Sequence, residues 1–189
     1  TVTPLDAWPS TPQMTATTGN LTGTFSVSDG IDRLLVILVC GYDSGGSTGQ
    51  TYTATYGGKA LTQAYVQTNA KHSTWIGYLK ETDIGSRTGD DVTVTIAGTH
   101  TNVVGYMASY SSVDQTTPVT ASGGTYVNNA NGVTIGGPLA VNAGGFAVAR
   151  NRLRPKRLVG QRHFRDCGEL QVSGGMQVRP PPSLSRGSL

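Results

Sequence analysis

Residues 89–98 have the sequence GDDVTVTIAG, whose centre alternates strictly between apolar and polar side chains. Val92, Val94 and Ile96 therefore lie on one face of an extended chain, and the intervening threonines lie on the other. This period of two is typical of an antiparallel sheet with one buried face and one solvated face. Residues 33–43, RLLVILVCGYD, are instead continuously apolar from Leu34 to Cys40, which indicates a central strand.

Further strand signals extend outward from these two segments. We predict strands at 21–27, 52–56, 60–66, 73–80 and 102–110, and shorter ones at 133–135 and 146–148. Turn dipeptides separate them, and Gly57-Gly58 predicts a hairpin between 52–56 and 60–66. No helical periodicity longer than about two turns interrupts the pattern. The sequence therefore predicts an all-β fold, an antiparallel β-sandwich or jelly roll, with an irregular basic C-terminal arm.

The charge of the 189-residue chain divides it into unequal parts. Residues 1–149 hold 5 Lys/Arg and 9 Asp/Glu, a net charge of −4, whereas residues 150–189 hold 9 Lys/Arg and 2 Asp/Glu, a net charge of +7. We therefore expect an N-terminal arm at 1–20, a β-sandwich domain at 21–149 and a basic, Pro- and Arg-rich tail at 150–189.

The basic tail begins with a dense run of cations, and these are the residues that we predict to contact a partner: Arg150, Arg152, Arg154, Lys156 and Arg157. Such a tail would be attracted to the acidic body of a neighbouring copy or to another acidic subunit. A disordered or artefactual tail is the first alternative. Nucleic-acid binding is the weakest one, because Phe164 is the tail's single aromatic and a stacking platform needs several.

A family resemblance rests on five motifs in order between Arg33 and Val119. They are RLLVILVCGYD (33–43), TATYGGKALTQAYVQT (53–68), STWIGYLKE (73–81), GDDVTVTIAG (89–98) and VVGYMASYSSVDQTTPV (103–119). This order resembles a β-sandwich module of phage structural proteins and bacterial extracellular proteins, over about residues 21–149. In the last motif, Ser112 stands where the module usually has Gly.

The resemblance implies a jelly-roll or concanavalin-like sandwich used for display, adhesion or particle decoration, and it carries over no catalytic residue. In such modules an aromatic strand usually follows the Gly-Gly segment found here just before Phe146, whereas this chain turns basic. We therefore hypothesise that residues from about 150 onward are out of frame relative to the family. The nucleotide sequence of the gene tests this, because the shifted frame must read through and restore a strand pattern.

Candidate catalytic and metal-binding groups are sparse. The three histidines, His72, His100 and His163, have no second ligand at metal-binding spacing, and no strained serine elbow is present. The acidic pairs Asp90-Asp91 and Glu81/Asp83 are more typical of solvated turns than of a glycosidase dyad, and Asp29/Asp32 is a weak Ca²⁺ candidate. Asp114 is expected to cap a turn through its own carboxylate. We therefore expect no enzyme, no cofactor and no metal.

Aromatic side chains are the stronger candidates for binding. Eight lie on predicted strands or at their ends, and they would fill the core if buried or stack on sugars and partner proteins if exposed: Tyr42, Tyr52, Tyr56, Tyr65, Trp75, Tyr78, Tyr106 and Tyr110. We expect most of them in the core. Cys40 is predicted to be a small buried side chain, and nothing in the sequence supports a bridge to Cys167.

These features predict a non-catalytic structural protein of a phage particle, such as a capsid decoration (cement) protein or a tail or fibre component. Its partners would be other structural subunits, including copies of itself, and its location the virion. The alternative is a secreted carbohydrate-binding or adhesive module, with a glycan as partner. The first residues, Thr1-Val2-Thr3-Pro4, carry no signal-peptide pattern, and no apolar run is long enough for a membrane span.

Overall fold

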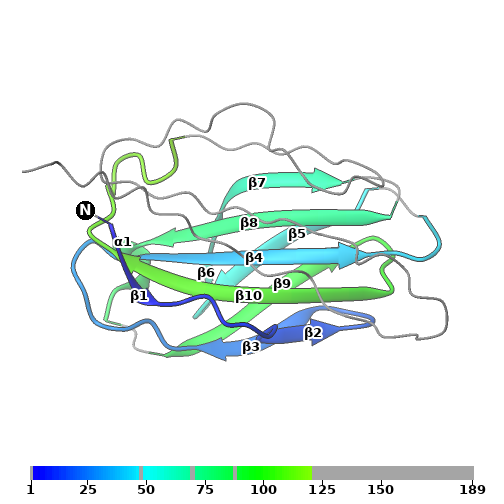
Figure 1. Cartoon of the computed structure of the whole chain (residues 1–189), viewed down its shortest axis with the longest axis horizontal. Helices are drawn as coiled ribbons and strands as arrows, with labels where there is room; N and C mark the ends of the chain where they lie inside the picture. The colour runs from blue at the N-terminus through cyan, green and yellow to red at the C-terminus, as the bar shows by residue number, and fades with distance from the viewer. Residues whose placement is uncertain (1, 47–48, 69–70, 87–88, 121–189) are drawn as a thin grey trace, which may run out of the picture.

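The computed structural model describes residues 2–46, 49–68, 71–86 and 89–120, and it confirms the predicted all-β sandwich (Figure 1). The elements in chain order are β1 (Thr3–Asp6), β2 (Met14–Ala16), β3 (Leu21–Phe25), β4 (Leu34–Tyr42), β5 (Thr51–Tyr56), β6 (Lys59–Ala60), β7 (Thr62–Thr68), β8 (His72–Lys80), α1 (Glu81–Ile84), β9 (Asp90–Ala97) and β10 (Asn102–Ser111). The basic tail and the strands predicted at 133–135 and 146–148 lie outside the described residues.

Two antiparallel sheets stack face to face. The larger sheet has the order β1-β10-β4-β8-β7, with β2 also paired to β10, and the smaller sheet has the order β3-β9-β5-β6. The central ladder runs in unbroken register from Leu34↔Tyr110 to Tyr42↔Asn102 between β4 and β10. The continuously apolar segment of the sequence is therefore the middle strand of the larger sheet, as expected.

The core lies between the sheets and follows the alternation read from the sequence. Val92 and Val94 of β9 face Leu35, Ile37 and Val39 of β4, and all five are buried. The largest buried side chains of this core are aromatic and come from both sheets, Trp75 from β8 and Tyr52 and Tyr56 from β5. Thr93 and Thr95 of β9 point the other way, so this strand has the one buried face that its pattern predicts.

The predicted hairpin at Gly57-Gly58 forms, but it is much shorter than the sequence suggests. Only Thr55↔Ala60 and Tyr56↔Lys59 pair across it, and the chain then leaves for the other sheet, where Thr62 pairs with Tyr78. The strand predicted over 60–66 is therefore split: its first residue belongs to β6, and the residues from Thr62 belong to β7 in the larger sheet instead of continuing the hairpin. Leu61 lies between the two strands, with its side chain packed against the core between the sheets and its amide donating to Ala54 O.

The segment 1–20, which the sequence set apart as an N-terminal arm, adds two strands to the larger sheet. β1 and β2 both pair with the same edge of β10. Between them the side-chain amide of Gln13 accepts a hydrogen bond from the backbone N–H of Met107, and Gln13 N–H bonds to Gly105 O. The edge of β10 is thus paired along most of its length, which protects it from pairing with another chain.

A candidate binding face on the larger sheet

The larger sheet is apolar on the face that points away from the smaller sheet. We call this the outer face and define it by the alternate side chains of β4, β8 and β10, which register into cross-strand rows: Asn102–Tyr42–His72, Val104–Cys40–Thr74, Tyr106–Leu38–Ile76, Ala108–Val36–Tyr78 and Tyr110–Leu34–Lys80. All rows except that of Asn102, Tyr42 and His72 contribute to two hydrophobic clusters that are separate from the core between the sheets. An antiparallel sandwich normally has a polar outer face, so the apolar character of this one is unusual.

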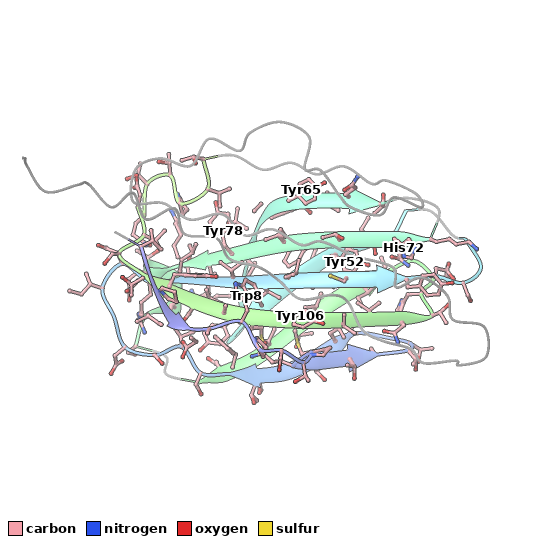
Figure 2. The ribbon with its side chains drawn as sticks, viewed as in Figure 1. Trp8, Tyr52, Tyr65, His72, Tyr78 and Tyr106 are labelled. Carbon is pink, nitrogen blue, oxygen red and sulfur yellow. The ribbon has the colours of Figure 1, made fainter. Side chains whose placement is uncertain are left out.

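Trp8 lies on this face, placed there by the chain that loops out between β1 and β2 (Figure 2). Its ring packs against both outer clusters, and its indole N–H donates to the hydroxyl of Tyr110 at 2.5 Å. Burial raises the pKa of Tyr110 to about 12, against the opposing effect of that hydrogen bond. The phenol therefore stays neutral and serves as the polar anchor for an otherwise apolar contact.

Aromatic rings lie beside polar side chains at two places on the outer face, the end row of Tyr42 and His72 and the stretch of β7 opposite Ile76. The rings of Tyr42 and His72 lie 5.1 Å apart between centroids and are tilted by 30°. Tyr65 of β7 is half-buried and donates to Gln67 at 2.7 Å, and burial raises the pKa of its phenol. Half-buried tyrosines beside amide and imidazole groups can stack on an apolar ring and bond to its substituents.

The eight aromatics singled out from the sequence divide between the two faces. Five are buried, as expected for most: Tyr52, Tyr56 and Trp75 in the core between the sheets, and Tyr106 and Tyr110 on the outer face. Tyr42, Tyr65 and Tyr78 are half-buried on the outer face. Cys40 is buried on that same face and is a free thiol, which confirms its predicted role as a small apolar side chain.

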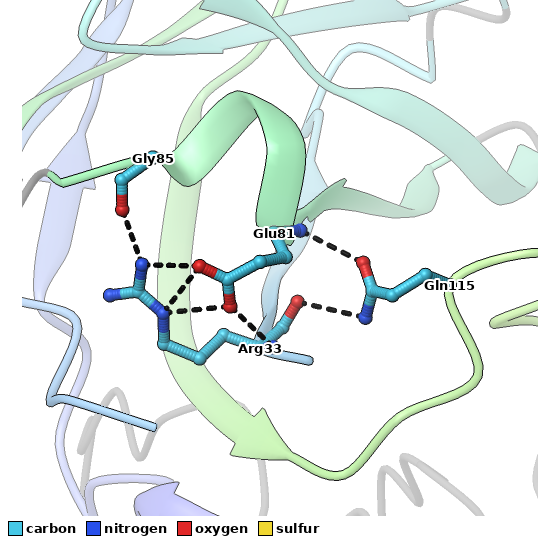
Figure 3. A network of polar contacts seen from close by, with 4 residues as sticks. All are labelled: Arg33, Glu81, Gly85 and Gln115. Carbon is cyan, nitrogen blue, oxygen red and sulfur yellow. Dashed lines mark hydrogen bonds and ion pairs between the residues drawn. The ribbon is translucent and has the colours of Figure 1, made fainter. Parts of the chain in front are cut away.

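The ionisable groups that do come together form structural contacts. Arg33 is buried, and its guanidinium donates to both carboxylate oxygens of Glu81, at 2.6 to 3.1 Å, and to Gly85 O (Figure 3). The hydrogen bonds from Arg33 hold the pKa of Glu81 below its usual range, and the same contact raises the pKa of Arg33. The pair fastens α1 and the end of β8 to the start of β4.

Gln115 completes this network. Its amide oxygen accepts from Glu81 N–H at 2.9 Å and its amide nitrogen donates to Arg33 O at 3.2 Å. The preceding residue, Asp114, accepts from the amides of Thr116 and Thr117, which confirms the predicted turn cap and lowers its pKa. Sequence reasoning singled out Asp114 and overlooked Gln115, although both belong to the same SSVDQTTP motif. The motif therefore forms a joint, that is, a set of hydrogen bonds that connects the turn after β10 to α1 and to the start of β4 at one end of the sandwich.

Two further polar clusters are also internal joints. Asp43 is buried and accepts from Gly45 N–H at 2.9 Å and from the hydroxyl of Thr99 at 2.8 Å. In the core, Tyr52 bonds to Ser73 and to Gln50, and burial raises the pKa of its phenol. These side chains satisfy one another inside the fold, so neither cluster presents a nucleophile to solvent.

Six other acidic residues gather at the end of the sandwich where α1 lies. They occupy the β3–β4 connection, α1, the start of β9 and the turn after β10, and we call them the acidic end: Asp29, Asp32, Asp83, Asp90, Asp91 and Asp114. Lys80 and Lys59 also lie at this end. Within the described ranges, no three His, Cys, Asp or Glu side chains are grouped so that they could hold a metal ion.

The other predicted site residues are not brought together. His72 lies on the outer face beside Tyr42, and His100 lies in the β9–β10 connection. His163 and the five predicted partner contacts, Arg150, Arg152, Arg154, Lys156 and Arg157, lie outside the described residues. None of the helices in the described part of the chain is long and apolar enough to cross a membrane. Comparisons with protein-family models, curated proteins and solved structures found no match.

Proposed function

We propose that this chain is a non-catalytic structural subunit of a phage-type particle, a capsid decoration protein or a tail or fibre component, that works through contacts with other subunits. The observation that carries the proposal is the separation of charge along the chain. Six carboxylates gather at the acidic end, whereas residues 150–189 have a net charge of +7. A basic arm of one copy is thereby complementary to the acidic end of the next.

The internal chemistry of the sandwich supports a scaffold role. The buried Arg33, Asp43 and Gln50 all bond within the fold, and the motif that the resemblance shares with particle proteins forms the joint at Gln115. A subunit of this kind needs a stable body and a surface for its neighbours, and it needs no cleft. Its location would be the virion, and a homo-oligomer would be its simplest assembly.

The test is the salt dependence of self-association. We expect the full chain to sediment as an oligomer at low ionic strength and to dissociate as salt is raised, since a Debye length shrinks from about 30 Å at 0.01 M to about 3 Å at 1 M. Replacing Arg150, Arg152, Arg154, Lys156 and Arg157 by Gln should abolish the oligomer. The control, Arg179→Gln with Arg186→Gln, removes charge from the same tail and should leave it largely intact.

A particle assay tests the biological part of the proposal. Mass spectrometry of purified virions from the source of the gene should find this chain in stoichiometric amounts. A chain that stays monomeric at every salt concentration and is absent from particles would contradict the proposal.

A second candidate function is a secreted glycan-binding or adhesive module, located outside the cell. The half-buried Tyr42, Tyr65 and Tyr78 on one sheet face favour it, because stacked rings are the usual platform for sugars. Glycan-array binding that is lost in Tyr42→Ala and retained in Tyr56→Phe would support it. Tyr56 is a suitable control because it is fully buried in the core between the two sheets, away from the outer face.

A further inference from the structure

The N-terminal segment, residues 2–16, is held by a strand that lies far from it in the sequence. β1 and β2 both pair with β10, with Pro4 opposite Tyr110 and Thr15 opposite Val104 (Figure 1). The side-chain contacts between this segment and β10 join residues that are 94 to 108 positions apart. A pairing over such a distance needs no particular connection between its strands, so β10 of a second copy offers the segment the same partners.

The contacts of the segment are specific enough to hold two chains together. Met14 is 2% exposed in the core between the sheets, and Trp8 packs against both clusters of the outer face. The side chain of Gln13 accepts from Met107 N–H, and the backbone N–H of Gln13 donates to Gly105 O. Backbone pairing gives affinity and anchored side chains give specificity when a strand from another subunit joins a sheet.

A short exposed turn joins the segment to the rest of the domain. Residues 17–20 are exposed and link β2 of the larger sheet to β3 of the smaller one. Asn20 is fixed to the body, because its side-chain oxygen accepts from Ile96 N–H at 3.2 Å. Gly19 has a φ of 76°, which the tight turn requires and an extended connection does not. Opening of the turn at residues 17–19 would therefore detach the segment without rearranging the body.

We propose that residues 2–16 of one copy occupy the same place on β10 of a second copy, and that the exchange is reciprocal, so that two copies form a closed dimer. The edge of β10 is paired in both arrangements, by its own segment in the monomer and by the partner's segment in the dimer. The inference goes beyond the proposed function and does not depend on it. Attraction between the basic tail and the acidic end falls with salt, whereas the buried contacts of Trp8 and Met14 carry no charge.

Disulfide trapping tests the exchange directly. Thr3 and Ser111 face each other across β1 and β10, at a spacing that a disulfide can bridge. One chain carries Thr3→Cys and another carries Ser111→Cys, both with Cys40→Ser and Cys167→Ser. The two chains are mixed in urea, refolded together and oxidised. We expect at least about tenfold more covalent dimer than from Ser111→Cys mixed with Thr53→Cys, an exposed control position on the smaller sheet.

The double variant Thr3→Cys/Ser111→Cys on one chain checks the register of β1 on β10. It should form the disulfide whether or not the segment is exchanged. A double variant that closes its disulfide as a monomer, together with a mixture that gives no more dimer than the control, would overturn the inference. A double variant that forms no disulfide would also overturn it, because β1 would then not lie on β10.

Sedimentation of turn variants is a second test that needs no added cysteine. Gly19→Ala strains the closed turn, so it should raise the dimerisation constant by about tenfold or more at about 1 M salt. Gly58→Ala is the matched control, since Gly58 has the same φ of 76° and likewise has nothing within 4 Å of an added Cβ. Equal dimerisation of the two variants would contradict the exchange. An oligomer that salt dissociates bears on the proposed function alone, so the two proposals can fail separately.

Discussion

Removing the negative charge of Glu81 should weaken the sandwich at the joint that holds α1. In Glu81→Gln the side chain keeps its size, but the buried guanidinium of Arg33 loses its counter-ion and at least one hydrogen bond. Breaking one partner of a buried pair costs about 3–5 kcal/mol, and because Glu81 is 30% exposed we expect about 2–3 kcal/mol. The measurement is urea unfolding followed by tryptophan fluorescence at neutral pH.

A double-mutant cycle separates the pair from the loss of either side chain alone. Arg33→Met combined with Glu81→Gln should be clearly more stable than the sum of the single changes predicts, because no charge is then left buried without a partner. Asp91→Asn, at an exposed carboxylate, is the control and should change stability by less than about 0.5 kcal/mol. Additive single effects, or a Glu81→Gln loss as small as that of the control, would refute this account of the joint.

The same pair predicts a pH dependence whose sign follows from the lowered pKa of Glu81. A carboxylate whose pKa is lower in the folded state than in the unfolded state stabilises the fold at pH values above its unfolded-state pKa, which is near 4.3 for Glu. This stabilisation is lost as the pH falls through the folded-state pKa. The unmodified chain should therefore lose stability with acid below about pH 5 more steeply than Glu81→Gln does. Parallel acid profiles for the two proteins would show that the pair is not the cause.

Three further substitutions test single features of the fold. Ser112 has a φ of 58°, so Ser112→Gly should raise the free energy of unfolding by about 0.5–1 kcal/mol in the same urea assay, and a loss of stability would contradict the strain argument. A Cβ on residue 77 would lie 2.0 Å from the ring of Trp75, so Gly77→Ala should lower the free energy of unfolding by about 1–3 kcal/mol and shift the fluorescence emission of Trp75. An unchanged emission spectrum would mean that the ring does not lie there. Burial raises the pKa of Tyr110 to about 12, so stability should fall as the pH rises from the unfolded-state pKa, near 10, to about 12. Tyr110→Phe should make this alkaline loss smaller. Tyrosinate absorbance and urea unfolding at each pH measure the two effects.

Much of the fold follows from local side-chain patterns. The alternation at Val92–Ile96 and the apolar run at Leu34–Cys40 place two central strands and decide which face of β9 is buried. The N-terminal strands escape such reasoning, because β1 has four residues, including Pro4, and β2 has three. Proline is tolerated in β1 because the strand lies at the sheet edge, which only the tertiary structure shows.

The candidate site was less accessible to sequence reasoning than the fold. The aromatics were recognised, but their division between two faces depends on registers such as Tyr106–Leu38–Ile76, which join residues far apart in the chain. Arg33 and Glu81 are 48 residues apart, and neither has a local pattern that announces its partner. Trp8 is an isolated aromatic in a segment without strand periodicity, so its position on the outer face could not be predicted.

The position of β10 in the chain also affects how the domain can form during synthesis. β10 is the last described strand, yet it pairs with β1, β2 and β4, and its contact from Tyr110 to Trp8 joins residues 102 positions apart. β1 and β2 are therefore synthesised well before β10, the strand with which they pair. Long-range pairing of this kind slows folding to milliseconds or longer, so the nascent chain must avoid aggregation until residue 111 has emerged.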